Sequence, residues 1–364
     1  MAVTLERHQA HTSFIIEKLM AESANGLDIS AQLPVLKQEI LLNGINADET
    51  GMSAQRIYIW LVLLQCPITP YSNYAALLAR GASPSYAKIN NDTFRTLATD
   101  PLFARRVTNN SISRILNTIA WTLHDNALEK VQASHSIATT TPLPPSPSLE
   151  PGYRADDDFA SSTLAEPPSP KLTPSVADSA SIALPSGTAP ATYLQGMNVL
   201  AAPFLYACKS EPQAYTLLLT LLTIHMPSYI TPSMTGVHRG LSLLTKLLAV
   251  LDPTLSSHLL SKNLHPTTYA FPSVLTLSAC TPPLSEVLIL WDFFFAWGVH
   301  LNILAVAAQL HLMRDKLLAS DSPGRELRNM GPLRARTVIE LVLSFIPRLK
   351  QDLWEETIAH TNIQ

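Results

Sequence analysis

Apolar residues recur at helical spacing along most of the chain. Between residues 111 and 130 the isoleucines and leucines follow the i, i+3, i+4 pattern of an amphipathic helix, with Asn110 or Ser111 as the expected N-cap. Six further segments show the same spacing between prolines and glycines: 197–208, 211–226, 236–260, 284–297, 301–320 and 334–360. No segment sustains a period-two alternation of apolar and polar residues. The sequence therefore predicts an all-α fold with many helices.

The helical pattern stops between about residues 134 and 191. This stretch holds eleven of the 28 prolines and hardly any periodic apolar residues. Such a composition cannot bury enough surface to offset the entropy of ordering it, so we expect a long disordered insertion. Its four Ser/Thr-Pro pairs are candidates for proline-directed phosphorylation, although five more such pairs elsewhere make composition alone a sufficient explanation. The four pairs begin at Thr141, Ser146, Ser169 and Thr173.

Neither flank of this insertion shows a break in composition, which favours one fold interrupted by a loop over two linked domains. We therefore expect an N-terminal helical extension, a first part of the domain, the insertion, a second part and a C-terminal helical part. Their expected bounds are 1–39, 40–133, 134–191, 192–320 and 321–364. Residues near 95 and near 195 are then neighbours in space despite the hundred positions between them.

The composition of the chain limits which partners and which cellular compartment are expected. Hydrophobic residues make up 47% of the chain and charged residues only 15%, so the protein either buries much of itself or presents apolar surface to a partner. The net charge of −3 gives no reason to expect nucleic acid or an anionic membrane as a partner. Cys66, Cys208 and Cys280 are far apart, as is typical of a reduced cytosolic or nuclear protein, and Glu6 and His8 interrupt any secretory signal.

The segment from 287 to 310 is long and apolar enough to raise the question of a membrane span. Asp292 lies near its middle, and such a carboxylate costs about 2.5–3.5 kcal/mol on insertion scales. Gly298 and Asn302 indicate two helices that meet at a turn. These features favour a buried core segment over a membrane span.

Metal and nucleotide chemistry receive little support from the sequence. The eleven histidines are scattered, and His8 and His11, spaced i, i+3, have no cysteine or carboxylate cluster near them. GxSxG, Walker A and GxGxxG motifs are absent from the sequence. We expect no metal site and no cofactor of the chain's own.

A short polar segment, "KINNDTFRTL" at residues 88–97, carries the first candidate for chemistry. Its Asn and Asp residues are good caps for a helix that carries Phe94 and Leu97 inward. Asp92 and Arg95 are three residues apart on one helical face, so the carboxylate can hold the guanidinium in a fixed pose, suited to meet phosphate charge. An ordinary surface ion pair of little energetic weight explains the same spacing.

The second candidate lies at the end of the insertion, where "YLQGMNVLAAPFLY" enters an apolar helix at residues 193–206. Gln195 is either an ordinary polar residue at a helix start or a polar group presented to another molecule. Tyr193 and Gly196 flank it. The segment alone does not decide between these interpretations.

Taken in order, "IxxDxxR" (Ile89, Asp92, Arg95) and "YxQG" (Tyr193 to Gly196) resemble the two-finger motifs of TBC domains, the Rab-type GTPase-activating modules. Three other segments are similar to family motifs: "RIYIWLVLL" at 56–64, "LDPTLSSHL" at 251–259 and "LSEVLILWDFFFAWG" at 284–298. The resemblance covers about residues 40–320. Within the family, the chain most resembles the fungal mitotic checkpoint branch. The chain departs from the wider family at Gln65, Pro272 and Ser273, and we expect none of these to touch a finger residue.

The resemblance implies a mechanism and a role for each motif residue. Arg95 would enter the nucleotide site of a partner GTPase and neutralise developing phosphate charge, while Gln195 would hold the attacking water. Asp92 would keep Arg95 pre-oriented, Tyr193 would brace the loop by packing, and Gly196 would allow close approach of backbones. GTP and magnesium would belong to the partner. The chain would then be an activator that supplies residues in trans, rather than an enzyme by itself.

The resemblance also implies partners and a place in the cell. The implied partners are a small Ras-like or Rab-like GTPase and a scaffold subunit, with which the chain would form a two-component activator that restrains mitotic exit or septation. The chain itself would be cytoplasmic and would be brought to spindle poles by its partners. A second interpretation stays open, in which a TBC-like helical body binds a GTPase or scaffold without catalysing anything. The low charge and high apolar content suit that interpretation, whereas the presence of both Arg95 and Gln195 favours catalysis.

Overall fold

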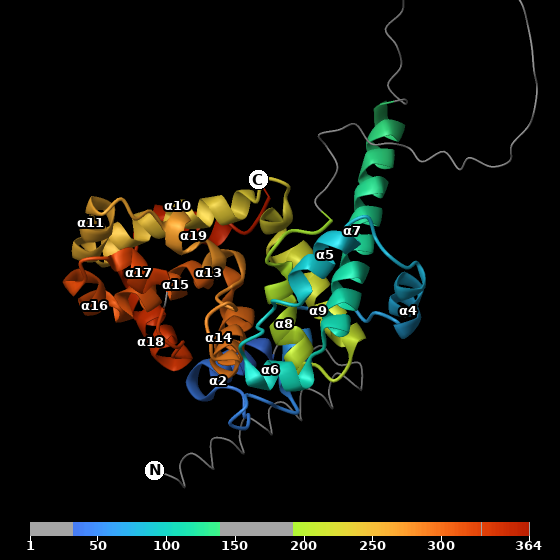
Figure 1. The fold of residues 1–364 in the computed structure, drawn as a ribbon, viewed down its shortest axis with the longest axis horizontal. Coiled ribbons are helices and arrows are strands. Elements are labelled where there is room, and N and C mark those ends of the chain that lie inside the picture. The colour runs from blue at the N-terminus through green and yellow to red at the C-terminus, as the bar shows by residue number, and fades with distance from the viewer. Residues whose placement is uncertain (1–31, 139–191, 329, 364) are drawn as a thin grey trace, which may run out of the picture. The chain divides into compact units, whose positions relative to one another are not determined.

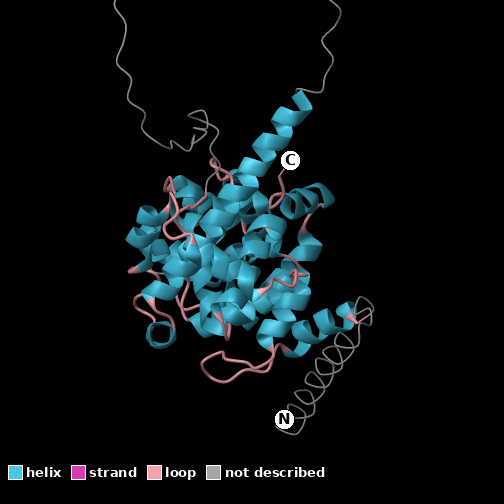
Figure 2. Cartoon of the chain, turned by 90° about the vertical axis from the view of Figure 1, so that its right-hand side faces the viewer, coloured by secondary structure: helices cyan, strands magenta, loops and turns pink. Residues whose placement is uncertain are grey.

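The computed structural model describes residues 32–138, 192–328 and 330–363 (Figure 1). These residues form helices and loops without a single strand among them (Figure 2), which confirms the predicted all-α class. Most of the expected N-terminal extension and nearly all of the expected insertion lie outside the described residues. The two described segments 32–125 and 192–363 belong to one compact unit, and residues 126–138 are the described part of a second.

Six helices among the described residues precede the insertion. They are α2 (Leu33–Asn43), α3 (Arg56–Leu63), α4 (Tyr71–Ala79), α5 (Tyr86–Thr93), α6 (Pro101–Arg106) and α7 (Asn109–Ala138). Helix α7 continues through residues 134–138, which the sequence interpretation placed in the insertion. Serine, histidine, isoleucine and alanine, which make up this stretch, do not interrupt a helix, whereas the prolines begin only at residue 142.

The expected N-cap of α7 is wrong by two or three residues. The helix begins at Asn109, and Thr108 provides the capping hydroxyl. The N–H of Ser111 donates to Thr108 Oγ1 over 3.1 Å, and the N–H of Thr108 donates to Ser111 Oγ over 3.1 Å. This reciprocal pair satisfies two backbone donors that the first turn of a helix leaves without partners.

After the insertion, each expected helical segment forms, and Pro253 and Pro347 lie at breaks within the segments 236–260 and 334–360. The elements are α8 (Met197–Ala207), α9 (Glu211–Thr220), η1 (Leu221–His225), η2 (Pro227–Ile230), α10 (Thr235–Leu251), α11 (Pro253–Ser261), α12 (Pro266–Tyr269), α13 (Phe271–Leu275), α14 (Leu284–Trp297), η3 (Val299–Leu301), α15 (Asn302–Leu312), α16 (Arg314–Ala319), α17 (Pro323–Arg328), α18 (Ala335–Phe345), η4 (Ile346–Arg348) and α19 (Gln351–Ala359). Asp252 separates α10 from α11, because its carboxylate accepts the N–H of Leu255 over 3.0 Å while Pro253 begins the new helix.

The apolar segment 287–310 forms two core helices rather than one long span. Helix α14 ends before Gly298, whose φ of +123° lies in a region that favours glycine, and α15 starts at Asn302. Asn302 is buried and donates to the carbonyl oxygen of Ser273 over 3.0 Å. Across residues 32–138, 192–328 and 330–363, no helix combines the length and the apolar character needed to cross a bilayer.

A buried ion pair joins the two halves of the chain. Asp292 on α14 accepts from Nε and Nη2 of Arg56 on α3, each over 3.0 Å, and from the indole N–H of Trp60 over 2.8 Å. Burial raises the pKa of Asp292, and the Arg56 charge opposes that effect. Removing one partner of such a pair costs about 3–5 kcal/mol, because the other charge stays buried without compensation.

Aromatic side chains pack around this pair and complete the core of the compact unit. The ring of Trp60 lies 5.7 Å from that of Phe204 on α8 and 5.1 Å from that of Phe295 on α14, both in edge-to-face geometry. Helices α3, α8 and α14 are thereby fixed to one another. Helix α5 packs on α8, so the position of α5 depends on the same core.

Candidate functional site

Helix α5 places Asp92 and Arg95 at its C-terminal end. The helix runs from Tyr86 to Thr93, with Ser85 at its N-cap position and Ile89 fully buried. The expected helix over residues 88–97 is therefore wrong in register. Phe94 is 66% exposed rather than inward, and Leu97 has a φ of +43°, because the chain turns sharply after Thr93.

Asp92 is the centre of the hydrogen-bond network at this turn. Its Oδ1 receives the Arg95 guanidinium as an ion pair, and its Oδ2 accepts the phenolic O–H of Tyr193 over 2.7 Å. The Asp92 side chain is only 7% exposed, whereas that of Arg95 is 52% exposed. Burial, with a further contribution from Asp92, raises the pKa of Tyr193, so this hydroxyl stays protonated and donates. Residues on both sides of the insertion thus share one carboxylate.

The loop that carries Gln195 is fixed by a glycine and an asparagine. Gly196 has a φ of +105°, and a Cβ atom there would lie 2.6 Å from Leu275 Cδ2, so only glycine fits. Its N–H donates to Asn198 Oδ1 over 3.1 Å, and Asn198 Nδ2 donates to Thr96 Oγ1 over 2.8 Å. These bonds join the start of α8 to the turn after α5. Gln195 itself is exposed.

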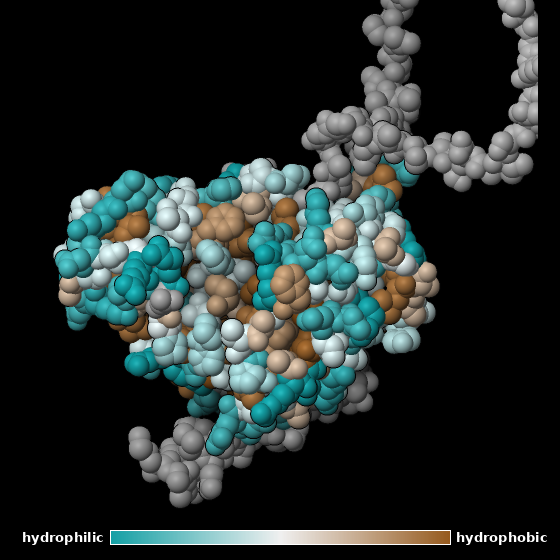
Figure 3. All heavy atoms as spheres, viewed as in Figure 1, coloured by the Kyte–Doolittle hydropathy of each residue, from teal (hydrophilic) through white to brown (hydrophobic). Residues whose placement is uncertain are grey.

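Arg95 and Gln195 line one open pocket of about 600 Å³. Its walls come from the start of α8, from Met234 before α10, and from α13 with the loop after it. On the face shown in Figure 3, apolar side chains gather in the middle, over the region where Figure 1 places α8, α13 and α14. Two polar groups therefore project from a largely apolar surface. We call this the finger pocket.

Arg95 and Gln195 both expose polar groups to solvent. Arg95 makes no hydrogen bond to the described residues other than the one to Asp92, so most of its donors face solvent. A guanidinium that is aimed by a buried carboxylate and otherwise open can bind an anion such as phosphate in a bidentate manner. The exposed amide of Gln195 can accept from a water and donate to an oxygen at once.

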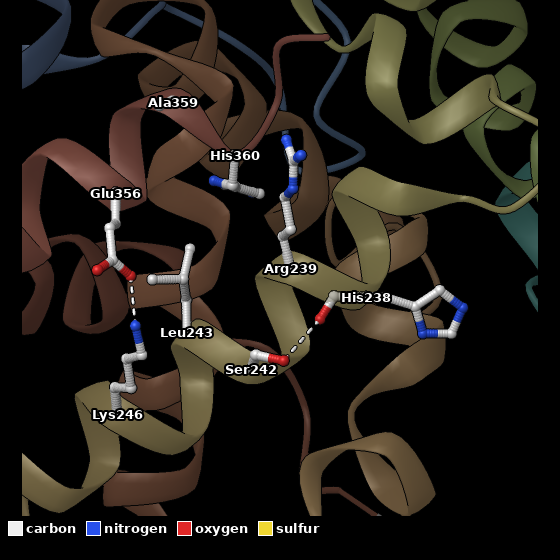
Figure 4. A pocket seen from close by; sticks show the side chains of 8 residues that line it. All are labelled: His238, Arg239, Ser242, Leu243, Lys246, Glu356, Ala359 and His360. Carbon is white, nitrogen blue, oxygen red and sulfur yellow. Dashed lines mark hydrogen bonds and ion pairs between the residues drawn. The ribbon is translucent and has the colours of Figure 1, made fainter. Parts of the chain in front are cut away.

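The pocket between α10 and α19 has a different character (Figure 4). It measures about 420 Å³, and Lys246 Nζ lies 2.5 Å from Glu356 Oε2, so these charges neutralise each other. His360 contacts the Tyr229 hydroxyl through Nε2 at 2.9 Å, and burial lowers the pKa of His360 to about 4. Neither Arg95 nor Gln195 lines this pocket. We interpret it as the seam by which the C-terminal helix docks on α10.

Metal ligation finds no support among the residues that the structure describes, since they hold no group of three or more His, Cys, Asp or Glu side chains that could bind an ion.

Comparison with known proteins identifies the family. The Rab-GTPase-TBC domain model matches residues 188–318. Cell division control protein 16 of Schizosaccharomyces pombe is 37% identical over 325 residues, which cover 89% of this chain and 87% of that protein. The chain belongs to the Rab-GTPase-TBC domain family. Mitotic check point protein BUB2 of Saccharomyces cerevisiae is 33% identical over 336 residues, covering 91% of this chain and 92% of that protein.

Solved structures agree with this membership at the level of the fold. The Chlamydomonas flagellar RabGAP TBC domain superposes with a TM-score of 0.58 at 15% identity, covering 94% of this chain and 96% of that one. The Ypt/Rab-GAP domain of Gyp1p gives a TM-score of 0.57 at 16% identity, with coverage of 91% and 98%. The arrangement of TBC helices is thus present in this chain.

The three departures from the wider family have different structural settings. Gln65, where glycine is frequent, adopts a φ of +52° in the loop after α3, a conformation that favours glycine. Ser273 is buried. Pro272 lines the finger pocket together with Arg95 and Gln195. The expectation that it does not touch either finger residue stays a prediction.

Two residues of the site escaped the sequence interpretation. Asn198 connects Gly196 to Thr96, and Leu275 fills the space beside Gly196. A signal for Asn198 was present, because a lone asparagine in the apolar run "MNVLAAPFLY" is buried only if it has hydrogen-bond partners. No comparable signal marks Leu275, which is one leucine among many.

Proposed function

We propose that this chain accelerates GTP hydrolysis on a small GTPase of the Ras-like or Rab-like class, with Arg95 and Gln195 as the residues it supplies. The observation that supports this proposal is that the two residues, a hundred positions apart, line one pocket and are joined through Asp92 and Tyr193. The partner would bring GTP and magnesium. The chain would bring the missing cation and the missing amide.

Each residue has a defined task in this mechanism. Arg95 would leave its exposed position, enter the partner's site and neutralise charge that develops on the phosphates, a contribution of about 10³–10⁵ in rate for arginine fingers. Asp92 restricts the guanidinium before docking, which lowers the entropy lost on binding. Gln195, which lines the finger pocket next to the left-handed turn at Gly196, would orient the attacking water.

The relatives suggest the process in which this activity is used. They are named as a cell division control protein and a mitotic check point protein. We therefore place the activity in restraint of mitotic exit or septation, with a scaffold subunit completing a two-component activator and directing it to spindle poles.

A single-turnover phosphate-release assay tests the proposal. The full chain is added to a panel of GTP-loaded Ras-like and Rab GTPases, alone and with co-purified partners. At least one GTPase should be accelerated by about 10³-fold or more. Repeating the assay with a GTPase whose own water-orienting glutamine is replaced asks whether Gln195 acts in trans. Binding to GTP-loaded partners without any acceleration would instead support a non-catalytic interaction module.

A further inference from the structure

A second groove lies apart from the finger pocket, and its walls are mostly apolar. It has a volume of about 670 Å³ between the first residue of α2, the end of α3, the loop 65–69 and the first turns of α9. Leu33, Leu61, Val62 and Pro212 contribute to the walls. None of its lining residues is shared with the finger pocket. We call it the α3–α9 groove.

Two features indicate that the α3–α9 groove lacks an occupant. Ile68, on the loop that borders it, is 99% exposed, which leaves a large apolar side chain entirely in water. Gln213 Oε1 is buried among the lining residues and has no hydrogen-bond partner. A buried acceptor without a partner is costly, so an occupant that covers apolar surface and brings one donor would satisfy both features.

The chain itself supplies a segment of the right chemistry close by. Leu33, the first residue of α2, is part of the groove wall, and residues 1–31 precede it outside the described residues. Within them, "FIIEKLM" at residues 14–20 places apolar side chains at i, i+3 and i+4, with Glu17 and Lys18 opposite. Backbone N–H groups at the start of a helical segment have no acceptor within the helix and are available as donors.

We propose that residues 14–20 of the same chain dock in the α3–α9 groove with their apolar face. Twelve residues separate Met20 from Leu33, and an extended chain of that length spans up to about 40 Å, which is ample for the segment to turn back. Asn25 and Gly26 form a turn-prone pair within this connection. This intramolecular contact is separate from the GTPase-activating function proposed above and does not depend on it.

Cys66 reports directly on occupancy, because it lines the groove, while Cys280 lines the finger pocket and serves as an internal control. The full chain is treated with a maleimide, and labelling of each cysteine is followed by mass spectrometry. Leu19→Asp, which puts a charge on the apolar face, should speed labelling of Cys66 at least about tenfold. That ratio corresponds to docking by about 1.4 kcal/mol. Ala21→Asp adds the same charge on the opposite face and should change nothing.

Buried Cys208 distinguishes release of the segment from general unfolding, since only unfolding exposes all three thiols. Equal labelling of Cys66 in the wild type, Leu19→Asp and Ala21→Asp would overturn the proposal. So would protection of Cys66 that grows with protein concentration, because a second copy would then be the occupant.

The reciprocal experiment alters the groove instead of the segment. Ile68→Asp should release residues 14–20 and speed tryptic cleavage after Lys18. The matched control is Ile224→Asp, another exposed isoleucine that does not line the groove, and it should leave cleavage after Lys18 unchanged. Rapid cleavage after Lys18 in the wild type, unaffected by either substitution, would show that the segment is not docked.

Discussion

Two arginine–aspartate pairs in this protein have the same chemistry and opposite settings. The pair of Arg56 and Asp292 is 1% and 3% exposed, and the guanidinium also donates to the carbonyl oxygen of Gly51. In the pair of Arg95 and Asp92, the carboxylate is 7% exposed and the arginine 52%. Both carboxylates accept a second donor from an aromatic residue, the indole of Trp60 in one case and the phenol of Tyr193 in the other.

The two pairs differ in how many hydrogen-bond donors of the arginine remain available to a partner molecule. Three of the Arg56 nitrogens have acceptors within the fold, so this cation is consumed by the core. Arg95 spends one nitrogen on Asp92 and presents the rest to the finger pocket. A buried pair fixes helices, whereas a pair with one exposed member keeps a cation aimed and available. The first pair serves the core, whereas the second leaves a cation available to a partner.

The largest effect is expected for Arg95→Ala. Loss of the finger should reduce GTPase stimulation by about 10³-fold or more, while the free energy of unfolding changes by less than about 1 kcal/mol. Arg95→Lys should also fail largely, because a point charge does not reproduce the planar fork. Phosphate release and urea unfolding measure the two quantities. Arg105→Ala, at an exposed arginine outside the finger pocket, is the matched control and should retain stimulation.

The comparison predicts the reverse outcome for Asp292→Asn. Arg56 then stays buried without its counter-charge, and the free energy of unfolding should fall by about 3–5 kcal/mol. The equivalent change Asp92→Asn should cost only about 1 kcal/mol, since Arg95 can turn to solvent. Denaturant titration of both variants gives the contrast. Equal losses of stability would show that exposure does not distinguish the two pairs.

Gln195→Ala separates positioning of water from binding. Stimulated hydrolysis should drop by about 10²-fold, the scale seen when one positioned polar donor is removed from a reaction centre. Because the amide is exposed, stability should change by less than about 0.5 kcal/mol, and binding to the GTP-loaded partner should persist. Pull-down and phosphate release from one preparation test both statements. If stimulation is retained on a GTPase that lacks its own glutamine, Gln195 does not orient the water.

The smallest expected effect is a loss of stability at low pH, and it involves neither arginine–aspartate pair. His360 has a pKa lowered by burial to about 4, against about 6.5 when unfolded, so the unfolded chain binds a proton that the folded chain excludes. The contribution of His360 to the free energy of unfolding is fully present above about pH 6.5 and is lost as the pH falls toward 4. Between pH 7 and pH 5 the loss should be about 2 kcal/mol. His360→Gln should remove that part of the pH dependence, and His238→Gln, an exposed control, should leave it unchanged.

Much of the fold could be predicted from the sequence because it depends on local periodicity. The segments around Trp60 and Trp291 are apolar at helical spacing, and they form α3 and α14. The turn after Thr93 could not be predicted in this way. Phe94 looked like a core residue by its type, but the tertiary bonds of Asp92 and Asn198 end α5 early and leave that ring exposed.

The candidate site shows the same division. Family resemblance pointed to Arg95 and Gln195, and the structure places both in one pocket. Tyr193 was expected to brace the loop by packing, and it is buried in the core. The hydrogen bond from its hydroxyl to Asp92 was not predicted, because that contact depends on how α5 meets the loop before α8. Contacts made by Leu275 and Pro272 arise from α13, a five-residue helix with no periodic signal of its own. Such contacts are set by three-dimensional packing alone.

The bonds from Asp92 to Tyr193 and from Arg56 to Asp292 both connect residues before position 139 with residues after position 191. Non-covalent contacts therefore join the two halves directly. A cut in the chain there would make association of the two halves bimolecular, which adds the entropy cost of bringing two molecules together. The domain can thus be described as two parts of one polypeptide that are held together by non-covalent contacts. We therefore expect the two parts to associate when they are expressed as separate fragments. One fragment would then contribute Arg95 and the other Gln195 to a single reconstituted pocket.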